Sequence, residues 1–132
     1  MIPNLDERIH AVQATAGWSQ SLSISEMLGA WRSLIEQCED SYDWSIYEFD
    51  NDLSVRDRIE LVVSATELST SPAVQEMARQ VEDLDRRFRL LLLELSDLEK
   101  RNGWWRQGVL KYAGDEYARD VRSRFGSEIE VR

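Results

Sequence analysis

Apolar residues recur every three or four positions along most of the chain, a spacing that places them on one face of an α-helix. The pattern predicts a first helix over residues 4–16 and a second from residue 23 to about residue 40. Ser23, with a glutamate three positions later, has the spacing of a capping box and gives the second helix a defined start. Residues 41–52 are poorly periodic and predict a loop with one helical turn. A third helix is predicted from about residue 51 or 53 to residue 65.

The longest apolar seam begins after Ser71 and Pro72, a pair typical of a helix start. Its heptad-like apolar positions are Val74, Met77, Val81, Leu84, Phe88, Leu91, Leu95 and Leu98. They predict one helix from residue 72 to about residue 101, which would be about 45 Å long at 1.5 Å per residue. We interpret it as the central helix of an intramolecular bundle, because the other amphipathic segments need a partner face. A homodimer that pairs through this helix is an alternative, and the two arrangements are compatible.

Beyond Gly103 the helical pattern stops. Residues 103–114 contain two adjacent tryptophans and several glycines, which predicts an irregular segment, and residues 116–124 predict a short helix that Gly126 ends. Residues 127–132 are expected to be a frayed tail. No linker rich in proline or serine divides the chain. The predicted fold class is therefore all-α: a single-domain helical bundle over residues 1–132, with one long central helix and an irregular tryptophan-containing C-terminal segment.

The charge balance bounds the kind of partner. The 132 residues include 25 acidic and 16 basic ones, a net charge of −9. Such a chain lacks the basic footprint that neutralises phosphates, so neither direct nucleic-acid binding nor docking on an anionic membrane is expected. The longest uninterrupted apolar run has only four residues, and the first residues lack the features of a secretion signal, so the expected location is the cytoplasm. A basic protein is the partner that the charge favours.

The residue types that carry most catalytic and metal chemistry are scarce. One cysteine, Cys38, and one histidine, His10, leave no cluster for zinc, and Cys38 has the helical spacing of a buried position. No phosphate-binding glycine loop or nucleophile elbow is present. Nothing selects a catalytic pair among the 25 carboxylates. We therefore expect no enzymatic activity, no metal and no cofactor.

A calcium loop is the one metal motif that the sequence approaches. Asp50, Asp52 and Ser54 have the spacing of the first, third and fifth ligands of an EF-hand. The sixth position is Val55 where that loop requires glycine, and the twelfth is Leu61 where it requires glutamate. The motif fails at the positions where its geometry is strictest.

The acidic segment over residues 36–52 is the strongest candidate for a binding face. It holds seven carboxylates and no lysine or arginine, and aromatic residues interleave with them. Aromatic rings are typical interface anchors, and carboxylates accelerate association with a basic partner. The predicted contact residues are Tyr42, Asp43, Trp44, Tyr47, Glu48, Asp50 and Asp52. The alternative is a loop whose rings fold inward while its acids face water.

A second candidate patch is the adjacent pair Trp104 and Trp105. In an extended strand, neighbouring side chains point to opposite faces. We therefore expect one of the two rings in the core and the other at an interface.

Several short strings give the chain a resemblance to a known class of protein. They are LDERI at 5–9, GWS at 17–19, YEFDNDL at 47–53, RD at 56–57, WWR at 104–106 and ARD at 118–120. With these strings the chain resembles the small bacterial immunity proteins that are encoded beside polymorphic or contact-dependent toxins. The resemblance implies a non-enzymatic protein that binds one cognate toxin and blocks it. The acidic charge predicts that it does so by plugging a basic active-site or substrate cleft.

Two other functions remain open from the residues alone. The first is an acidic regulator or nucleic-acid mimic that binds a basic host protein. The second is an enzyme that uses carboxylates, which the missing catalytic motifs disfavour. A toxin gene immediately upstream would favour the immunity function over the regulator.

Overall fold

The computed structural model describes residues 3–94 and 103–132, which form a mainly helical fold with two small sheets. In chain order the elements are α1 (Leu5–Thr15), α2 (Ile24–Asp40), α3 (Ile46–Asp52), α4 (Ser54–Val63), the 3-10 turn η1 (Thr66–Leu68), α5 (Pro72–Arg89), β1 (Leu92–Glu94), the 3-10 turn η2 (Trp104–Arg106), β2 (Gly108–Leu110), β3 (Tyr112–Ala113), α6 (Asp115–Phe125) and β4 (Glu130–Val131). The capping box at Ser23 is present and starts α2 as predicted.

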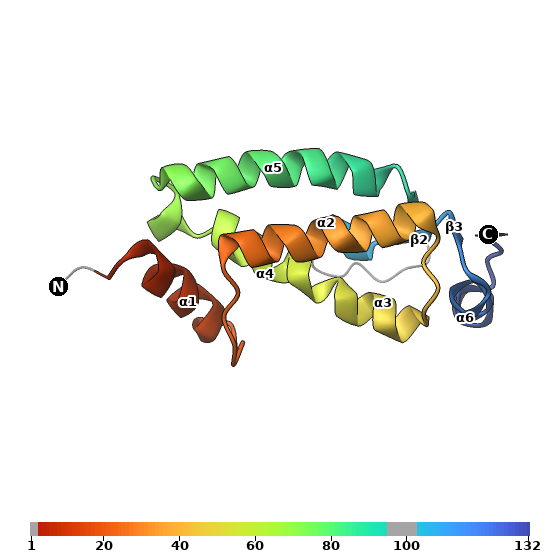
Figure 1. Ribbon diagram of the computed structural model, residues 1–132. Helices are drawn as coiled ribbons and strands as arrows, with labels where there is room; N and C mark the ends of the chain where they lie inside the picture. Colours follow the sequence, from red (N-terminus) through yellow and green to blue (C-terminus); the bar gives the residue numbers. More distant parts are fainter. Residues whose placement is uncertain (1–2, 95–102) are drawn as a thin grey trace.

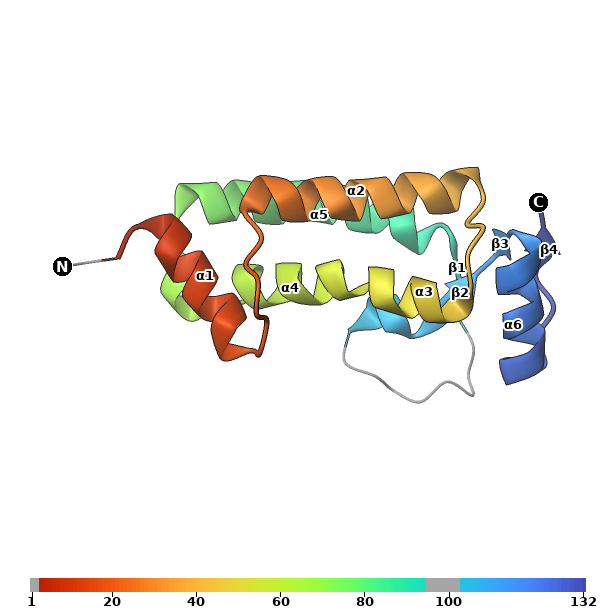
Figure 2. The same ribbon diagram turned by 60° about the horizontal axis from the view of Figure 1, so that its bottom comes forward.

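A bundle in which α2, α4 and α5 all contact one another makes the body of the molecule. Helices α2 and α5 lie side by side and run in the same direction, while α3 and α4 follow one another back along them (Figure 1). Helix α1 packs on α4 at one end, and α6 packs on α3 at the other, beside β3 and β4 (Figure 2). The expected intramolecular bundle is therefore present.

The core lies where α2, α4 and α5 meet. Trp31 of α2, Ile59 of α4 and Phe88 of α5 are buried there, and the rings of Trp31 and Phe88 are 4.8 Å apart between centroids. Cys38 is also buried, as expected, and burial raises the pKa of its thiol above the ordinary value. Its thiol is therefore protonated and unreactive at neutral pH.

The prediction of one helix over residues 72–101 is wrong in its second part. Helix α5 ends at Arg89, β1 begins at Leu92, and the seam positions at 95 and 98 lie outside the described residues. Helix α5 has 18 residues and α2 has 17. The two helices run parallel, and both finish at the same end of the bundle (Figure 1). There Arg87 pairs with Glu39 at 2.5 Å. Beyond that point a longer helix would have no α2 surface to cover, and the backbone pairs with β2 instead.

The C-terminal segment also departs from the all-α prediction. Strand β2 pairs antiparallel with β1, and β4 pairs in parallel with β3. Residues 127–132 are therefore not a frayed tail throughout, because the N–H groups of Glu130 and Arg132 donate to the carbonyls of Lys111 and Ala113 at 3.1 and 3.0 Å. These bonds join residues about 19 positions apart, which local periodicity does not report. Gly126 ends α6 in the left-handed conformation (φ 68°), as predicted.

Candidate functional site

The loop between α2 and α3 is held in place by the C-terminal part of the chain. The N–H of Gly114 donates to the Tyr42 carbonyl at 2.7 Å, and the Asp120 carboxylate accepts from the Ile46 N–H at 3.0 Å. A Cβ on Gly114 would lie 2.4 Å from Oδ1 of Asp43, so only glycine allows this approach. The loop that presents the predicted contact residues is thus fixed at both of its ends.

The aromatic residues of this loop and α3 divide into buried and exposed rings. Trp44 and Tyr47 are 56% and 68% exposed, as a contact surface requires, whereas Tyr42 is only 1% exposed. The ring of Tyr42 packs edge-on against Phe49 and Tyr117, at 5.3 and 6.0 Å between centroids. The prediction of Tyr42 as a contact residue is therefore wrong, because the loop turns this ring into the core.

Tyr42 still connects the core to the acidic surface. Its hydroxyl donates to Oδ2 of Asp52 at 2.7 Å. Burial raises the pKa of the Tyr42 phenol above its ordinary value, and the Asp52 carboxylate raises it further by accepting the hydroxyl proton's hydrogen bond and by its charge. The phenol is therefore neutral at physiological pH and fixes the orientation of Asp52.

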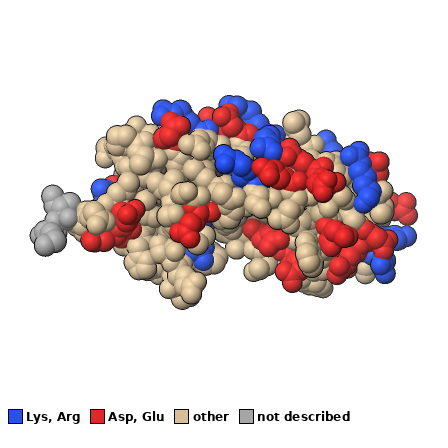
Figure 3. Space-filling model, in the orientation of Figure 1, with Lys and Arg blue, Asp and Glu red and all other residues tan. Residues whose placement is uncertain are grey.

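The carboxylates around α3 form a strongly negative surface. Asp43 and Glu48 are exposed, Asp50 and Asp52 are half-buried, and Nη1 of Arg124 lies 3.7 Å from Oδ2 of Asp50. Within residues 3–94 and 103–132, no cation lies within ion-pairing distance of Asp43, Glu48 or Asp52. Figure 3 shows acidic side chains gathering at the lower right of the molecule, in the region of α3. We call Asp43, Trp44, Tyr47, Glu48, Asp50 and Asp52 the acidic aromatic face.

A groove of about 530 Å³ runs along this face between α2 and the α3–α4 segment. One wall is a helical stripe of α2, and the other continues from the loop through α3 to the start of α4. The lining residues are Ala30, Ser33, Leu34, Gln37, Trp44, Glu48, Asp52 and Val55. The groove thus combines an exposed indole and two carboxylates, with the nearly buried side chains of Leu34 and Val55 at its base.

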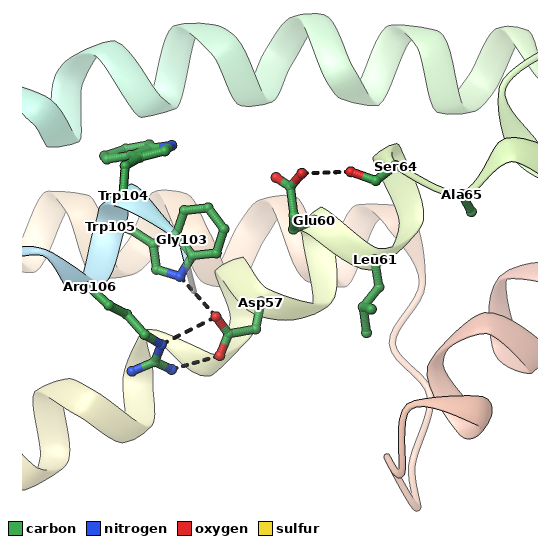
Figure 4. A pocket seen from close by; sticks show the side chains of 9 residues that line it. All are labelled: Asp57, Glu60, Leu61, Ser64, Ala65, Gly103, Trp104, Trp105 and Arg106. Atoms are coloured by element: carbon green, nitrogen blue, oxygen red, sulfur yellow. Dashed lines mark hydrogen bonds and ion pairs between the residues drawn. The ribbon is translucent and has the colours of Figure 1, made fainter. Parts of the chain in front are cut away.

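Trp104 and Trp105 lie beside α4, on the side away from the groove. We call Trp104, Trp105, Arg106 and Asp57 the tryptophan cluster. Trp105 is 5% exposed, and its indole N–H donates to Oδ1 of Asp57 at 2.9 Å (Figure 4). Arg106 binds the same carboxylate, with Nη2 2.7 Å from Oδ2. Trp105 is therefore a core residue and not a surface contact, which corrects its place among the predicted contacts.

Trp104 keeps part of its surface exposed. Its ring packs 6.1 Å from that of Phe88, between centroids, and the Arg89 guanidinium lies 4.0 Å from its centroid. The expectation that one of the two adjacent rings enters the core is met by Trp105. A contact role for Trp104 stays a prediction.

A buried ion pair behind the tryptophan cluster was not predicted. Arg56 binds Asp85 with both ends of its guanidinium, at 3.0 and 2.9 Å, and both residues are buried. The indole N–H of Trp31 donates to the same Asp85 carboxylate at 3.1 Å, and the Arg56 guanidinium lies 4.3 Å from the Trp105 ring centroid. A signal existed: Asp85 lies on the apolar stripe of α5, one position after Leu84.

A cavity of about 830 Å³ lies between α4 and η2, beside the tryptophan cluster (Figure 4). Its carboxylates are already paired, Asp57 with Arg106 and Glu60 with Arg56 at 3.0 Å. Burial raises the pKa of Glu60, but hydrogen bonds from Ser64 and Arg56, together with the Arg56 charge, outweigh burial and lower it overall. The lowered pKa keeps Glu60 ionised, and both carboxylates are bound to arginine, an arrangement that stabilises the structure.

The part of the chain that the structure describes contains no group of three or more histidine, cysteine, aspartate or glutamate side chains arranged to hold a metal ion. Asp50 and Asp52 lie within α3, and Ser54 begins α4. A helix cannot wrap its side chains around calcium as an EF-hand loop does. None of the described helices combines the length and apolar character needed to cross a membrane.

Comparisons with known proteins assign no family to the chain. No family model matches its sequence, and neither a curated protein nor a solved structure matches it. The function is therefore inferred from the residues of the chain itself.

Proposed function

We propose that this protein binds and neutralises a cognate bacterial toxin, and that it does so by presenting the acidic aromatic face to a basic cleft. The observation that carries the proposal is the exposure of Trp44 and Tyr47 beside Asp43, Glu48 and Asp52, three carboxylates with no cation within ion-pairing distance among the described residues. The sequence resemblance to immunity proteins is the reason for proposing a toxin as the partner. The surface itself supports a basic protein partner.

Exposed tryptophan and tyrosine are the residues that most often carry binding energy at protein interfaces. Here both rings stand on a segment that hydrogen bonds from Gly114 and Asp120 hold in place, so little conformational entropy is lost when a partner binds. The surrounding carboxylates attract a basic partner over a distance of about a Debye length, 8 Å at physiological salt, and raise the association rate.

The experiment is a rescue of growth. The toxin domain encoded by the gene immediately upstream is expressed in a heterologous bacterial host, alone and together with this protein. We expect the toxin to stop growth and co-expression to restore it. A toxin that remains fully active beside well-expressed protein would overturn the proposal, and so would an upstream gene whose product is harmless.

A charge variant connects the rescue to the acidic aromatic face. Four changes to amides, Asp43→Asn, Glu48→Gln, Asp50→Asn and Asp52→Asn, should weaken the rescue. The matched control makes the same number of changes at exposed acids elsewhere, namely Asp6→Asn, Glu82→Gln, Glu116→Gln and Glu128→Gln. The control should protect like the wild type. Equal loss in both sets would point to net charge alone and not to this face.

Binding to a basic host protein without any toxin would favour the alternative of an acidic regulator. The two functions use the same surface, and they differ in the partner. Purified protein that binds the upstream-encoded toxin domain with one-to-one stoichiometry supports immunity. Failure to bind that domain contradicts it.

A further inference from the structure

No cation of residues 3–94 or 103–132 occupies the groove beside α3, whereas a described arginine stacks on each half-buried tryptophan of the chain. Arg58 lies 4.0 Å from the Trp18 ring centroid, and Arg89 lies 4.0 Å from that of Trp104. Trp44 is more exposed than either, and no described cation stacks on its ring.

The tryptophan cluster shows the complete arrangement. Around Trp105, one arginine lies over the ring and a second binds the neighbouring carboxylate of Asp57 through two nitrogens. Indole, carboxylate and guanidinium suit one another, because guanidinium is planar, stacks on aromatic faces and offers a fork of N–H donors. The groove has the indole of Trp44 and the carboxylates of Glu48 and Asp52, and no described arginine lines it.

We propose that the groove between α2 and α3 receives an arginine from a basic segment of the partner protein, seated between the Trp44 ring and the carboxylates of Glu48 and Asp52. This inference rests on the proposed function, because it names the chemistry that the same face recognises. The Tyr42 hydroxyl donates its hydrogen bond to Oδ2 of Asp52, so Oδ1 can accept one from the incoming guanidinium.

The size and the floor of the groove say more about the segment. A volume of about 530 Å³ holds more than one side chain. Ala30 and Ser33 are small, so the α2 wall is low, and the nearly buried Leu34 and Val55 lie at its base. The volume therefore fits a short stretch of chain that contains an arginine, and not an isolated cation.

The direct test uses the blocked tripeptide Ac-Leu-Arg-Leu-NH₂ as the probe and follows backbone amides and tryptophan indole N–H groups by NMR. Saturable shifts should concentrate at the Trp44 indole and at the amides of Ser33, Glu48 and Asp52. The tripeptide Ac-Leu-Glu-Leu-NH₂ should produce none. No saturable shift with the arginine peptide, or shifts spread over acids outside the groove, would overturn the proposal.

Two variants sharpen this test. Ser33→Arg places the missing cation in the groove from within the chain, and it should weaken binding of the arginine probe about tenfold, since a stacked and paired guanidinium contributes on the order of 1.4 kcal/mol. Ser123→Arg makes the same change at an exposed position of α6 and should bind the probe like the wild type. Equal effects of the two variants would contradict a specific groove. Glu48→Gln, which changes an exposed side chain without changing its size, serves if Ser33→Arg does not fold.

The rescue assay separates this proposal from the proposed function. If the four-amide variant loses protection while a folded Ser33→Arg variant keeps it, the face binds the toxin but the groove does not receive its arginine. If the wild type itself gives no rescue, the proposed function fails, and the tripeptide titration alone decides whether the groove binds arginine.

Discussion

The tryptophan cluster and the acidic aromatic face are built from the same kinds of residue and differ in one component. Both place tryptophan beside aspartate or glutamate. In the cluster, arginines of the chain stack on the rings and pair with the carboxylates, and Trp105 is buried. On the face, Trp44 is exposed and Glu48 has no cation within ion-pairing distance in residues 3–94 and 103–132.

The difference teaches where to look for function in such a chain. A charged and aromatic cluster that satisfies its own charges contributes to stability and specificity of the fold. The same chemistry is open to a partner at Asp43, Glu48 and Asp52, which no cation of the described residues pairs. Substitutions in the cluster should therefore change the free energy of unfolding, and substitutions on the face should change binding.

The largest effect is expected from the buried pair behind the cluster. Asp85→Ala leaves Arg56 buried without its partner and should lower the free energy of unfolding by about 3–5 kcal/mol. Urea denaturation followed by circular dichroism measures this. The double variant Arg56→Met with Asp85→Leu removes both charges and should recover most of the loss. A single variant as stable as the wild type would mean that the ion pair is not buried in solution.

The next effect concerns the face. Trp44→Ala should weaken binding of the cognate toxin by about 2 kcal/mol or more, mainly through faster dissociation, while stability changes by less than about 0.5 kcal/mol. Surface plasmon resonance and thermal melting measure the two quantities on the same preparation. A melting loss that accounts for the weaker binding would place Trp44 with the cluster and remove the contrast.

A smaller effect comes from a single atom of the cluster. Trp105→Phe removes the indole N–H that binds Asp57 and keeps most of the ring, so it should cost about 1.5 kcal/mol of unfolding free energy, the usual value for a hydrogen bond to a charged group. Trp44→Phe is the matched control and should leave stability unchanged. Equal stability of both variants would contradict the assignment of Trp105 to the core.

Alkaline pH tests the burial of the two tyrosines, Tyr42 and Tyr117, that lie beneath the acidic aromatic face. Burial raises the pKa values of Tyr42 and Tyr117 above the ordinary 10.0, so folding favours the neutral phenols. Their stabilising effect is complete below pH 10 and is lost as the pH rises further, with a slope of up to about 1.4 kcal/mol per pH unit for each phenol. Tyr42→Phe should make the loss of stability less steep in denaturation curves taken across this range. An unchanged slope would argue that Tyr42 is solvated.

The last effect is kinetic. The four-amide variant of Asp43, Glu48, Asp50 and Asp52 should associate with the toxin about tenfold more slowly at low salt, and its association rate should depend less on salt. Stopped-flow fluorescence at several salt concentrations measures both. If the rate and its salt dependence match those of the wild type, the binding face lies elsewhere, and the exposed part of Trp104 becomes the leading candidate.

Much of the fold follows from local pattern. The capping box at Ser23 and the apolar stripe that follows predict α2 with both ends correct, and the pair Ser71-Pro72 predicts the start of α5. The end of α5 at Arg89 does not follow from its own seam, because it depends on where the neighbouring α2 ends. The pairing of β3 with β4 is likewise nonlocal.

The candidate site was also predictable only where it depends on local sequence. The surplus of carboxylates around Trp44 and Tyr47 is a local property and was visible in the sequence. Which rings turn inward was not, because Tyr42 packs against Tyr117 of α6, which lies far from it in the chain. The pairing of Arg56 with Asp85 spans 29 positions and leaves only a polar residue on an apolar stripe as its trace.

The buried pair between α4 and α5 also restricts how these helices can align. Valine and leucine side chains are similar enough in size that an apolar seam alone tolerates a slide of one helical turn. Such a slide would move Asp85 about 5.4 Å along the axis and leave two charges in the core without partners. The alternative alignment is therefore raised in free energy far more than the native one is lowered, and the chain selects a single register for its longest described helix.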